Sequence, residues 1–484
     1  MMDRIIGRKQ ELSELQRSMN SDRSEFVIIY GRRRVGKTFL VEHFFDGNYD
    51  FSFVGGHRLA KAKQLRNFAK ALKKYAQLSR QPKLTDWDEA FDALEDYLDS
   101  LPKEKRKVVF IDEMPWIDTP QSEFVDGLEM FWNGWAARRN DIVFVATGSS
   151  TSWMVDKLVE NQGGLHGRIT RNIYVKPFTL NEVEQYLCSQ GAKWDRYQIL
   201  QAYMTVGGIP FYYSLMDVKD SLIQNIDRLF FRKNGTLRIE FYELYHALFM
   251  HADKYIQVVK LLNGSRKGLS RKEISASLGF NGSVLTNILR NLERCDFVIR
   301  YSQFGNKTND AIYRLMDFYT LFYFRFVDSI NSQDEMWWSH NYQSHAVEAW
   351  QGLSFELIAL THLPQIKKKL GISGISTAAS SWRYHPSRTK EEKPEDKGTQ
   401  IDLLIDRADR IINLCEMKFS VKPFRITAAY EQHLRNRMDI FKTKTKTTKA
   451  LAHTFVTTYG VADGQHHSIV DSEVTMYDLF EITD

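Results

Sequence analysis

The chain has 484 residues, of which 43% are hydrophobic and 13% aromatic, and it carries 66 Lys and Arg against 60 Asp and Glu. This apolar content excludes a wholly disordered protein, and the length is typical of about three domains. The net charge of +6 permits a polyanionic partner but is too small to indicate one by itself. Three widely spaced cysteines exclude a disulfide framework and show no metal-ligand spacing.

The sequence shows no sign of a membrane segment. No apolar run approaches the roughly 18 residues that a spanning helix needs, and the first residues lack the basic and apolar segments of a secretory signal. Unpaired cysteines are typical of a reducing compartment. We therefore expect a cytoplasmic protein with no membrane partner.

The first part of the chain alternates short apolar runs with segments of helical spacing. The apolar runs are uninterrupted and rich in β-branched residues, which is typical of strands buried on both faces of a parallel sheet. We predict strands at residues 26–30, 108–111 and 142–146, and helices at residues 65–78 and 87–101. This alternation predicts an α/β core over residues 1–175.

A glycine-rich loop follows the first of these strands. Residues 31–38 match the pattern G-x-x-x-x-G-K-T/S between a strand and a predicted helix. Gly31 and Gly36 permit the backbone to curl so that its N–H groups face phosphate oxygens. Lys37 adds a positive charge for the phosphates, and the Thr38 hydroxyl is a suitable ligand for Mg²⁺. The loop predicts a site for a nucleoside triphosphate.

Acidic and hydroxyl side chains follow the next two predicted strands. Asp112 and Glu113 come directly after residues 108–111, where Asp112 would hold Mg²⁺ through water and Glu113 would polarise an attacking water as general base. Ser149 follows residues 142–146 and is our candidate for sensing the terminal phosphate. Capping of the following helix explains this serine equally well.

One arginine is a candidate for neutralising charge in the transition state. Arg168 lies beyond the last predicted strand of the core, and it could act within its own chain or across the subunit boundary of a homo-oligomer. The alternative is a plain surface charge.

These motifs resemble those of the archaeal-type P-loop ATPase family, which belongs with the AAA+ and STAND NTPases. The resemblance rests on residues 5–12, 30–38, 110–113, 163–168, 176–178 and 207–210. It implies a P-loop NTPase fold that uses ATP and Mg²⁺. It also implies nucleotide contacts from Ile6, Gly7, Val35, Phe39 and Pro210, with Ile6, Gly7 and Pro210 on the adenine side. For the Gly-Gly-Ile-Pro segment, a helix-ending turn is the alternative.

Beyond the core, the pattern changes twice. Residues 176–252 are predominantly helical, and we interpret them as a lid. Residues 253–316 contain three short helical segments and two strand-like segments around a polar tip that includes Lys307, which is the layout of a winged helix-turn-helix. This unit could contact DNA or serve as a rigid spacer or protein contact. Residues 317–350 are predicted to be an aromatic, helical connector.

The last segment, residues 351–484, returns to alternating helices and strands. Asp402 begins one predicted strand, and the next strand carries Glu416 and Lys418, which share a face because they are two residues apart. Both acids, with Glu356 on the preceding helix, could hold Mg²⁺, while Lys418 would position or activate a hydrolytic water. This is the chemistry of phosphodiester cleavage. The alternative is a surface salt bridge between the acids and Lys418.

This arrangement resembles the PD-(D/E)xK, or restriction-endonuclease-like, nuclease superfamily. It is most similar to the domain of uncertain function that is fused behind archaeal-type ATPases, and residues 313–318 and 352–356 are similar to that family's lead-in. Gln400 stands where the family commonly has Glu, and no Pro precedes Asp402. The resemblance implies a restriction-endonuclease-like α/β domain.

Two polar runs belong to the same segment. The charged residues 386–398 are predicted to form a hairpin tip. The lysine-rich residues 442–449 are interpreted as a solvated loop, with contact to a phosphate backbone as the alternative.

Together these features predict a Mg²⁺-dependent ATPase whose nucleotide state controls a DNA-binding or DNA-cleaving C-terminal domain. The alternative is an ATP-gated regulator or scaffold whose nuclease-like domain does not cleave. The expected partners are ATP and DNA, together with further copies of the chain if Arg168 acts between subunits.

Overall fold

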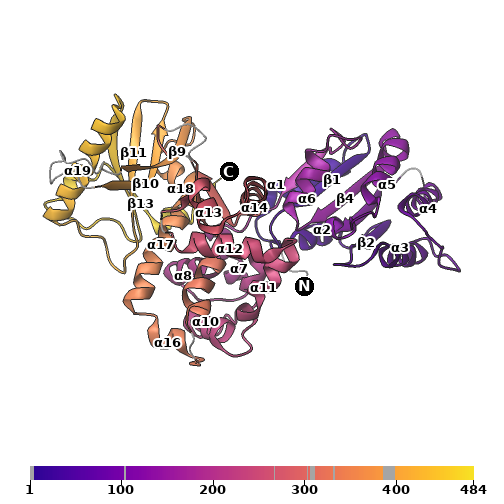
Figure 1. The fold of residues 1–484 in the computed structure, drawn as a ribbon, viewed down its shortest axis with the longest axis horizontal. Helices are drawn as coiled ribbons and strands as arrows, with labels where there is room; N and C mark the ends of the chain where they lie inside the picture. The colour runs from indigo at the N-terminus through magenta and orange to yellow at the C-terminus, as the bar shows by residue number, and fades with distance from the viewer. Residues whose placement is uncertain are drawn as a thin grey trace. The chain divides into compact units, whose positions relative to one another are not determined.

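The computed structural model describes residues 5–102, 105–265, 267–301, 303–305, 311–330, 333–384 and 398–483 (Figure 1). The chain divides into two units, which consist of Met1–Pro177, Ile209–Phe211 and His246–Met250, and of Phe178–Gly208, Tyr212–Tyr245 and His251–Asp484. Lys307 and residues 386–397 of the predicted hairpin tip lie outside the described residues. In the parts of the chain that are described, no helix combines the length and the apolar character that crossing a bilayer demands.

A parallel five-stranded sheet in the order β2-β3-β4-β1-β5 lies at the centre of the first unit. Its strands are β1 (Glu25–Tyr30), β2 (Phe51–Val54), β3 (Lys107–Asp112), β4 (Ile142–Gly148) and β5 (Arg171–Tyr174). The three central strands confirm the three predicted from the sequence, and every residue of β3 and β4 is buried. The edge strands β2 and β5 are not evident in the sequence because each has only four residues and includes polar ones.

Helices and short helical turns surround this sheet. They are α1 (Lys9–Met19), α2 (Lys37–Phe45), α3 (Lys61–Tyr75), α4 (Trp87–Asp99), η1 (Met114–Trp116), α5 (Phe124–Met130), η2 (Phe131–Trp135), η3 (Ala136–Arg138), α6 (Thr151–Met154) and η4 (Val155–Val159). An aromatic cluster joins α3, α4 and α5 to the sheet. The ring of Phe68 lies 5.0 Å from that of Phe51 and 5.7 Å from that of Trp87, and Trp87 lies 4.9 Å from Phe124. Burial of these rings supplies much of the core.

The chain then becomes helical, as the sequence predicts. The helices are α7 (Leu180–Ser189), α8 (Arg196–Val206), α9 (Pro210–Ser214), α10 (Leu222–Ile226), η5 (Asp227–Phe231) and α11 (Thr236–Leu248). Capping boxes begin α7 at Thr179 and α8 at Asp195, where each side chain accepts a hydrogen bond from the third residue of its helix. Such caps satisfy backbone N–H groups that the helix itself cannot.

Three helices and a small antiparallel sheet follow. They are α12 (Ala252–Asn263), β6 (Leu269–Ser270), α13 (Arg271–Leu278), α14 (Gly282–Arg294), β7 (Val298–Tyr301) and β8 (Ile312–Leu315), with strand order β6-β8-β7. Helix α14 buries Leu285, Ile288, Leu289 and Leu292 and exposes its polar face. The helical spacing of these apolar residues is the reason that α14 is evident in the sequence.

An aromatic segment connects this part to the C-terminal sheet. It contains α15 (Phe318–Phe322), η7 (Tyr323–Asp328), α16 (Trp337–Asn341), α17 (His345–Thr361) and α18 (Leu363–Lys369). The rings of Phe322, Phe326, Trp338 and Trp350 contact one another at centroid distances between 5.1 and 5.9 Å. Helix α17 contributes Trp350 to this cluster.

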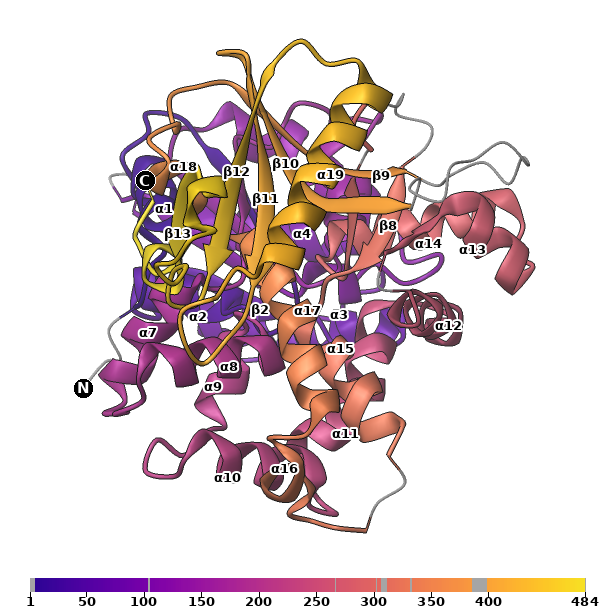
Figure 2. The ribbon, with the colours of Figure 1, turned by 90° about the vertical axis from the view of Figure 1, so that its left-hand side faces the viewer.

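The C-terminal sheet is mixed and has the order β13-β12-β11-β10-β9. Its elements are β9 (Thr377–Tyr384), β10 (Thr399–Arg407), β11 (Ile411–Lys418), α19 (Ala428–Thr445), β12 (Ala450–Thr457), η8 (His467–Ile469), β13 (Ser472–Thr475) and α20 (Met476–Leu479). Strand β10 pairs antiparallel with β9 and β11, whereas β12 pairs parallel with β11 and β13. Figure 2 shows α19 lying across β10 and β11, where Phe441 joins a buried cluster with Leu404 and Ile412.

One prediction for this part is wrong. The lysine-rich run was interpreted as a loop from residue 442, but α19 continues to Thr445, so Lys442 and Lys444 lie on its last turn. Lysine is a good helix former, and a positive charge at the C-terminus of a helix is stabilised by the helix dipole. The loop begins only at Lys446, whose φ of 53° ends the helix.

The aromatic cluster of the first unit yields a stability prediction. Phe68 is 1% exposed, and we expect Phe68→Ala to lower the free energy of unfolding of this unit by about 3–5 kcal/mol, because the cavity left behind cannot collapse among rigid rings. Chemical denaturation followed by tryptophan fluorescence measures this change. Leu78→Ala, at a side chain that is 40% exposed, is the control, and equal effects of the two substitutions would contradict the prediction.

Candidate functional site: a phosphate-binding loop and an acidic strand

The glycine-rich loop connects β1 to α2. Its backbone adopts a conformation that few sequences permit. Gly31, Arg34 and Gly36 have φ values of 146°, 71° and 92°. A Cβ atom on Gly31 would lie 2.4 Å from the carbonyl oxygen of Val175, so only glycine fits there. Left-handed residues that alternate with others, as Arg34 and Gly36 do around Val35, can turn backbone N–H groups toward one concave side, as in an anion-binding nest.

Two side chains at the end of this loop have different partners. The buried Lys37 ammonium donates hydrogen bonds to the carbonyl oxygens of Gly31 at 3.1 Å and Arg32 at 3.0 Å. The Thr38 hydroxyl donates to the two carboxylate oxygens of Asp112 at 3.0 and 3.1 Å. The end of this loop, where α2 begins, and the end of β3 therefore meet at one point, as the sequence predicts.

Asp112 is a carboxylate held away from water. Burial raises its pKa, and the repulsion of Glu113 adds to this effect, against the hydrogen bonds from Thr147 and Thr38 and the charge of Lys37. A hydroxyl and a carboxylate are hard oxygen ligands of the kind that Mg²⁺ prefers, and a divalent cation would offset the cost of burying this charge. The residues present fit Mg²⁺.

Thr147 and Ser149 at the end of β4 hold the two acids. The Thr147 hydroxyl donates to Asp112 and accepts from the backbone N–H of Glu113 at 3.1 Å. The amide and the hydroxyl of Ser149 both donate to the Glu113 carboxylate, at 3.0 and 2.8 Å. Ser149 therefore contacts the predicted general base directly, a relationship that its spacing in the sequence does not indicate.

A buried arginine outside the predicted site residues braces the loop. Arg8 donates to the carbonyl oxygen of Val35 at 3.1 Å and to that of Lys176 at 2.7 Å, and it lies 3.5 Å from Glu11. Gly7, with a φ of 64°, precedes it. Arg8 lies within the matched segment 5–12, but nothing in its local sequence distinguishes it from an exposed helix-flanking charge.

The remaining predicted nucleotide contacts lie around the same loop or at the surface. Val35 is buried and Ile6 half-buried, whereas Phe39 is 46% exposed and stacks on His43. Pro210 begins α9, and the ring of the next residue, Phe211, lies 4.1 Å below the guanidinium of Arg34. This cation–π contact connects the Gly-Gly-Ile-Pro segment to the phosphate loop.

Arg168 is exposed, and its guanidinium has no ion-pair partner among the described residues. By contrast, Arg139 is engaged with Asp99 and Asp141. A free, exposed arginine near the end of the core is compatible with the predicted role, although it does not approach the phosphate loop through any contact of its own.

The predicted C-terminal site is centred on Glu416. Leu403 of β10 pairs with Cys415 of β11, Asp402 directly precedes Leu403, and Glu416 directly follows Cys415. Glu416 is buried and contacts the guanidinium of Arg437, the hydroxyl of Tyr430 and, at 2.9 Å, the ammonium of Lys418. Burial alone would raise the pKa of Glu416, but the charges of Arg437 and Lys418 hold it at about 2.

The other predicted ligands have different partners. Glu356 on α17 lies 3.3 Å from the guanidinium of Arg314, and Asp402 accepts a hydrogen bond from Gln400. Among the described residues, no group of three His, Cys, Asp or Glu side chains is arranged to hold a metal ion. Each of the three predicted acids thus has a cation or an amide as its partner.

Sequence reasoning missed Arg437 and Tyr430. They are seven residues apart on α19, hence on one face of that helix. A search for polar residues at helical spacing in the segment that follows the Glu416 strand would have found both.

Comparisons with known proteins agree with the nucleotide-binding features of the first unit. The family model of an ATPase domain found predominantly in Archaea matches residues 5–216. An uncharacterised protein of Methanocaldococcus jannaschii is 26% identical over 332 residues, which cover 67% of this chain and 69% of that protein. An uncharacterised ATP-binding protein of the same organism is 46% identical over 42 residues, which cover 9% of this chain and 71% of that protein.

Solved structures are similar at a greater distance. The Walker-type ATPase of Pyrococcus abyssi superposes with a TM-score of 0.48 and 16% identity, over 66% of this chain and 95% of that one. The ORC2 protein of Aeropyrum pernix has a TM-score of 0.39 and 13% identity, over 68% of this chain and 94% of that one. At these scores, we draw no functional conclusion from either.

Proposed function

This chain belongs to the archaeal-type P-loop ATPase family, and on that basis we propose that it hydrolyses ATP with Mg²⁺ and that its nucleotide state controls a DNA-binding C-terminal domain. The observation that carries the first part is the contact between Thr38 and Asp112 beside the curled loop from Gly31 to Lys37. The loop offers a binding site for phosphates, and the Thr38–Asp112 pair offers a position for magnesium. The hydroxyl of Thr38 joins the two.

The residues of this site divide the work of hydrolysis. The loop amides and Lys37 bind the phosphates, and Thr38 and Asp112 hold the metal, which when bound would neutralise charge on the phosphate oxygens. Glu113 takes a proton from the attacking water, and Ser149 fixes the direction of its carboxylate through two hydrogen bonds. Ile6, Gly7, Val35, Phe39 and Pro210 contact the nucleotide in this proposal, and Arg168 stabilises transition-state charge within the chain or in a neighbouring subunit of a homo-oligomer.

Removal of the loop lysine tests nucleotide binding. We expect Lys37→Ala to weaken ATP affinity about 10- to 100-fold, because a charge-assisted contact to the phosphates is lost. Isothermal titration with ATP and Mg²⁺ measures this change. Lys9→Ala, at an exposed lysine, serves as control, and unchanged affinity in Lys37→Ala would refute the placement of the triphosphate.

Substitutions at Glu113 and Ser149 separate chemistry from binding. Glu113→Gln should retain ATP affinity and lower turnover about 100-fold or more, since the amide cannot accept the proton. Ser149→Ala should lower turnover less, because the Ser149 amide still holds the carboxylate. Phosphate release under saturating ATP measures both. Normal turnover in Glu113→Gln would remove Glu113 from this role.

The second unit supports an extension of the proposal to DNA. The helices α12 to α14 with the sheet β6-β8-β7 have the element order of a winged helix-turn-helix. The series α17, β9, β10, β11, α19 and β12 has the order expected for a PD-(D/E)xK-like domain, with Asp402 and Glu416 on the paired strands β10 and β11. Lys442, Lys444 and Lys446 are exposed at the end of α19, where they suit contact with a phosphate backbone.

A specific observation favours the alternative in which this domain binds without cutting. Arg437, Tyr430 and Lys418 occupy both oxygens of Glu416, and Glu356 is paired with Arg314. A metal ion would have to displace these partners from Glu416 and recruit further ligands. Only the cleaving version of the proposal therefore needs Mg²⁺ ligands at Asp402, Glu416 and Glu356. The same holds for the role of Lys418 in positioning a water molecule.

A nicking assay distinguishes the two versions. If the domain cleaves, supercoiled DNA incubated with the wild-type chain, ATP and Mg²⁺ or Mn²⁺ should be nicked, and the double substitution Glu416→Ala and Lys418→Ala should abolish nicking. Lys422→Ala, at an exposed lysine near the same strand, is the control. Absence of nicking by the wild type, together with ATP-dependent DNA retention in a gel-shift assay, would establish the binding version instead.

A further inference from the structure

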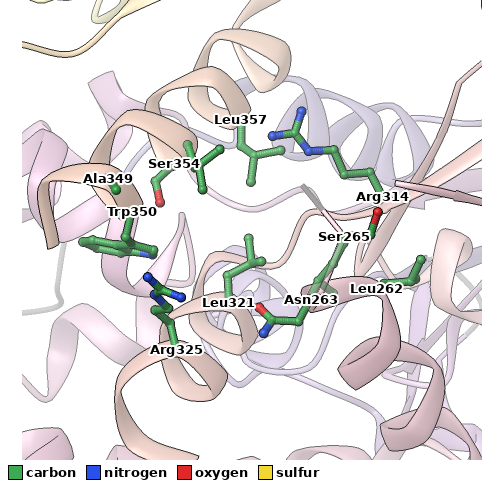
Figure 3. A pocket seen from close by; sticks show the side chains of 13 residues that line it. Leu262, Asn263, Ser265, Arg314, Leu321, Arg325, Ala349, Trp350, Ser354 and Leu357 are labelled. Carbon is green, nitrogen blue, oxygen red and sulfur yellow. The ribbon is translucent and has the colours of Figure 1, made fainter. Parts of the chain in front are cut away.

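A cavity of about 350 Å³ lies entirely within the second unit and outside both sites described above. Its lining comes from the end of α12, from β8, from α15 and η7, and from α17 (Figure 3). Its size falls within the range of small-molecule pockets, which begins at about 300 Å³. The polar groups around it are therefore informative about what it could bind.

One end of the cavity has a buried hydrogen-bond donor that lacks an acceptor. Trp350 is 5% exposed, and its indole nitrogen has no hydrogen-bond partner among the residues that the structure describes. The ring cannot turn away easily, because it packs against Phe322, Phe326 and Trp338 at centroid distances of 5.4, 5.4 and 5.9 Å. Buried donors in native proteins are almost always paired, so an unpaired, immobile one indicates an acceptor that comes from outside the chain.

A positive charge lies beside this donor. Figure 3 shows the guanidinium of Arg325 near the indole of Trp350, with the hydroxyl of Ser354 on the same side. No ion pair joins Arg325 to any described residue, whereas Arg314, across the cavity, is paired with Glu356. Of the described residues that line the cavity, none is acidic. The local charge balance thus calls for an anion next to Arg325.

The rest of the wall is apolar. Leu321 and Leu357 face the cavity in Figure 3, Leu262 also lines it, and Leu262 and Leu357 are almost completely buried. A ligand that satisfies Arg325 and Trp350 at one end would place its remaining atoms against these leucines. The lining therefore suits a ligand with one charged end and an apolar body.

We propose that this cavity binds a small organic anion, with its carboxylate, phosphate or sulfonate head on Arg325, the Trp350 indole N–H and the Ser354 hydroxyl, and a compact apolar body against the leucines. The ligand would contact α12 and β8 on one side and α17, which packs on β11, on the other. It would therefore act as an effector. Its binding would stabilise one arrangement of α12 to α14 and the sheet β6-β8-β7 against the C-terminal sheet.

Titration with 8-anilinonaphthalene-1-sulfonate, which combines an anionic head with an apolar body, tests the proposal on the full chain. We expect saturable fluorescence enhancement, an affinity about tenfold weaker in Arg325→Ala and a smaller weakening in Trp350→Phe. Arg325→Lys should restore part of the affinity. Arg232→Ala, at an exposed arginine elsewhere in the same unit, should bind like the wild type.

Competition identifies which end of the probe is recognised. Octanoate and octyl phosphate should displace the probe at lower concentrations than octanol, and this preference should disappear in Arg325→Ala. Equal displacement by octanol, or unchanged probe affinity in Arg325→Ala, would overturn the proposal. Because Arg325 is exposed, its replacement should leave folding intact, and an unchanged thermal unfolding curve by circular dichroism verifies this independently of whether the nucleotide proposal holds.

Discussion

The hydrogen bond from Thr38 to Asp112 joins two segments that are 74 residues apart, and the geometry of the first unit depends on it. It fixes the start of α2 against the end of β3, across a parallel sheet whose central strands are buried throughout. Burial removes water as a competitor for this contact, so each polar group at the sheet edge must find its partner within the protein. Thr147 meets the same requirement for Asp112 and Glu113.

The two units use buried charge in different ways. In the first, Asp112 accepts hydrogen bonds from two hydroxyl groups, and burial together with the neighbouring Glu113 raises its pKa, so it is suited to receive a cation. In the second, Glu416 already has Arg437 and Lys418 beside it and its pKa is lowered. Two buried carboxylates on strands therefore have pKa values shifted in opposite directions, and this difference separates the nucleotide site from the acidic strand more clearly than motif patterns do.

Much of the first unit could be predicted from the sequence because its signals are local. The loop pattern and the three apolar strands identify the core, since glycine spacing and uninterrupted β-branched runs reflect the backbone directly. The contacts of Ser149 with Glu113 and of Arg8 with Val35 could not be predicted, because they depend on how distant segments converge. The edge strands and the last turn of α19 were missed because short polar segments carry little periodicity. In the C-terminal part, the order of elements was evident, whereas the partners of Glu356 and Glu416 required the tertiary structure.

The two hydrogen bonds of Arg8 have a mechanical consequence. One guanidinium connects Val35, in the phosphate loop, with Lys176, next to the last residue of the first continuous segment of that unit. Because this side chain is buried, neither bond can be exchanged for one with water. When the loop tightens or relaxes around a triphosphate, the carbonyl of Lys176 must either follow the displacement or lose its donor. Lys176, near the end of the first continuous segment of this unit, is thus linked through Arg8 to the movements of the phosphate loop.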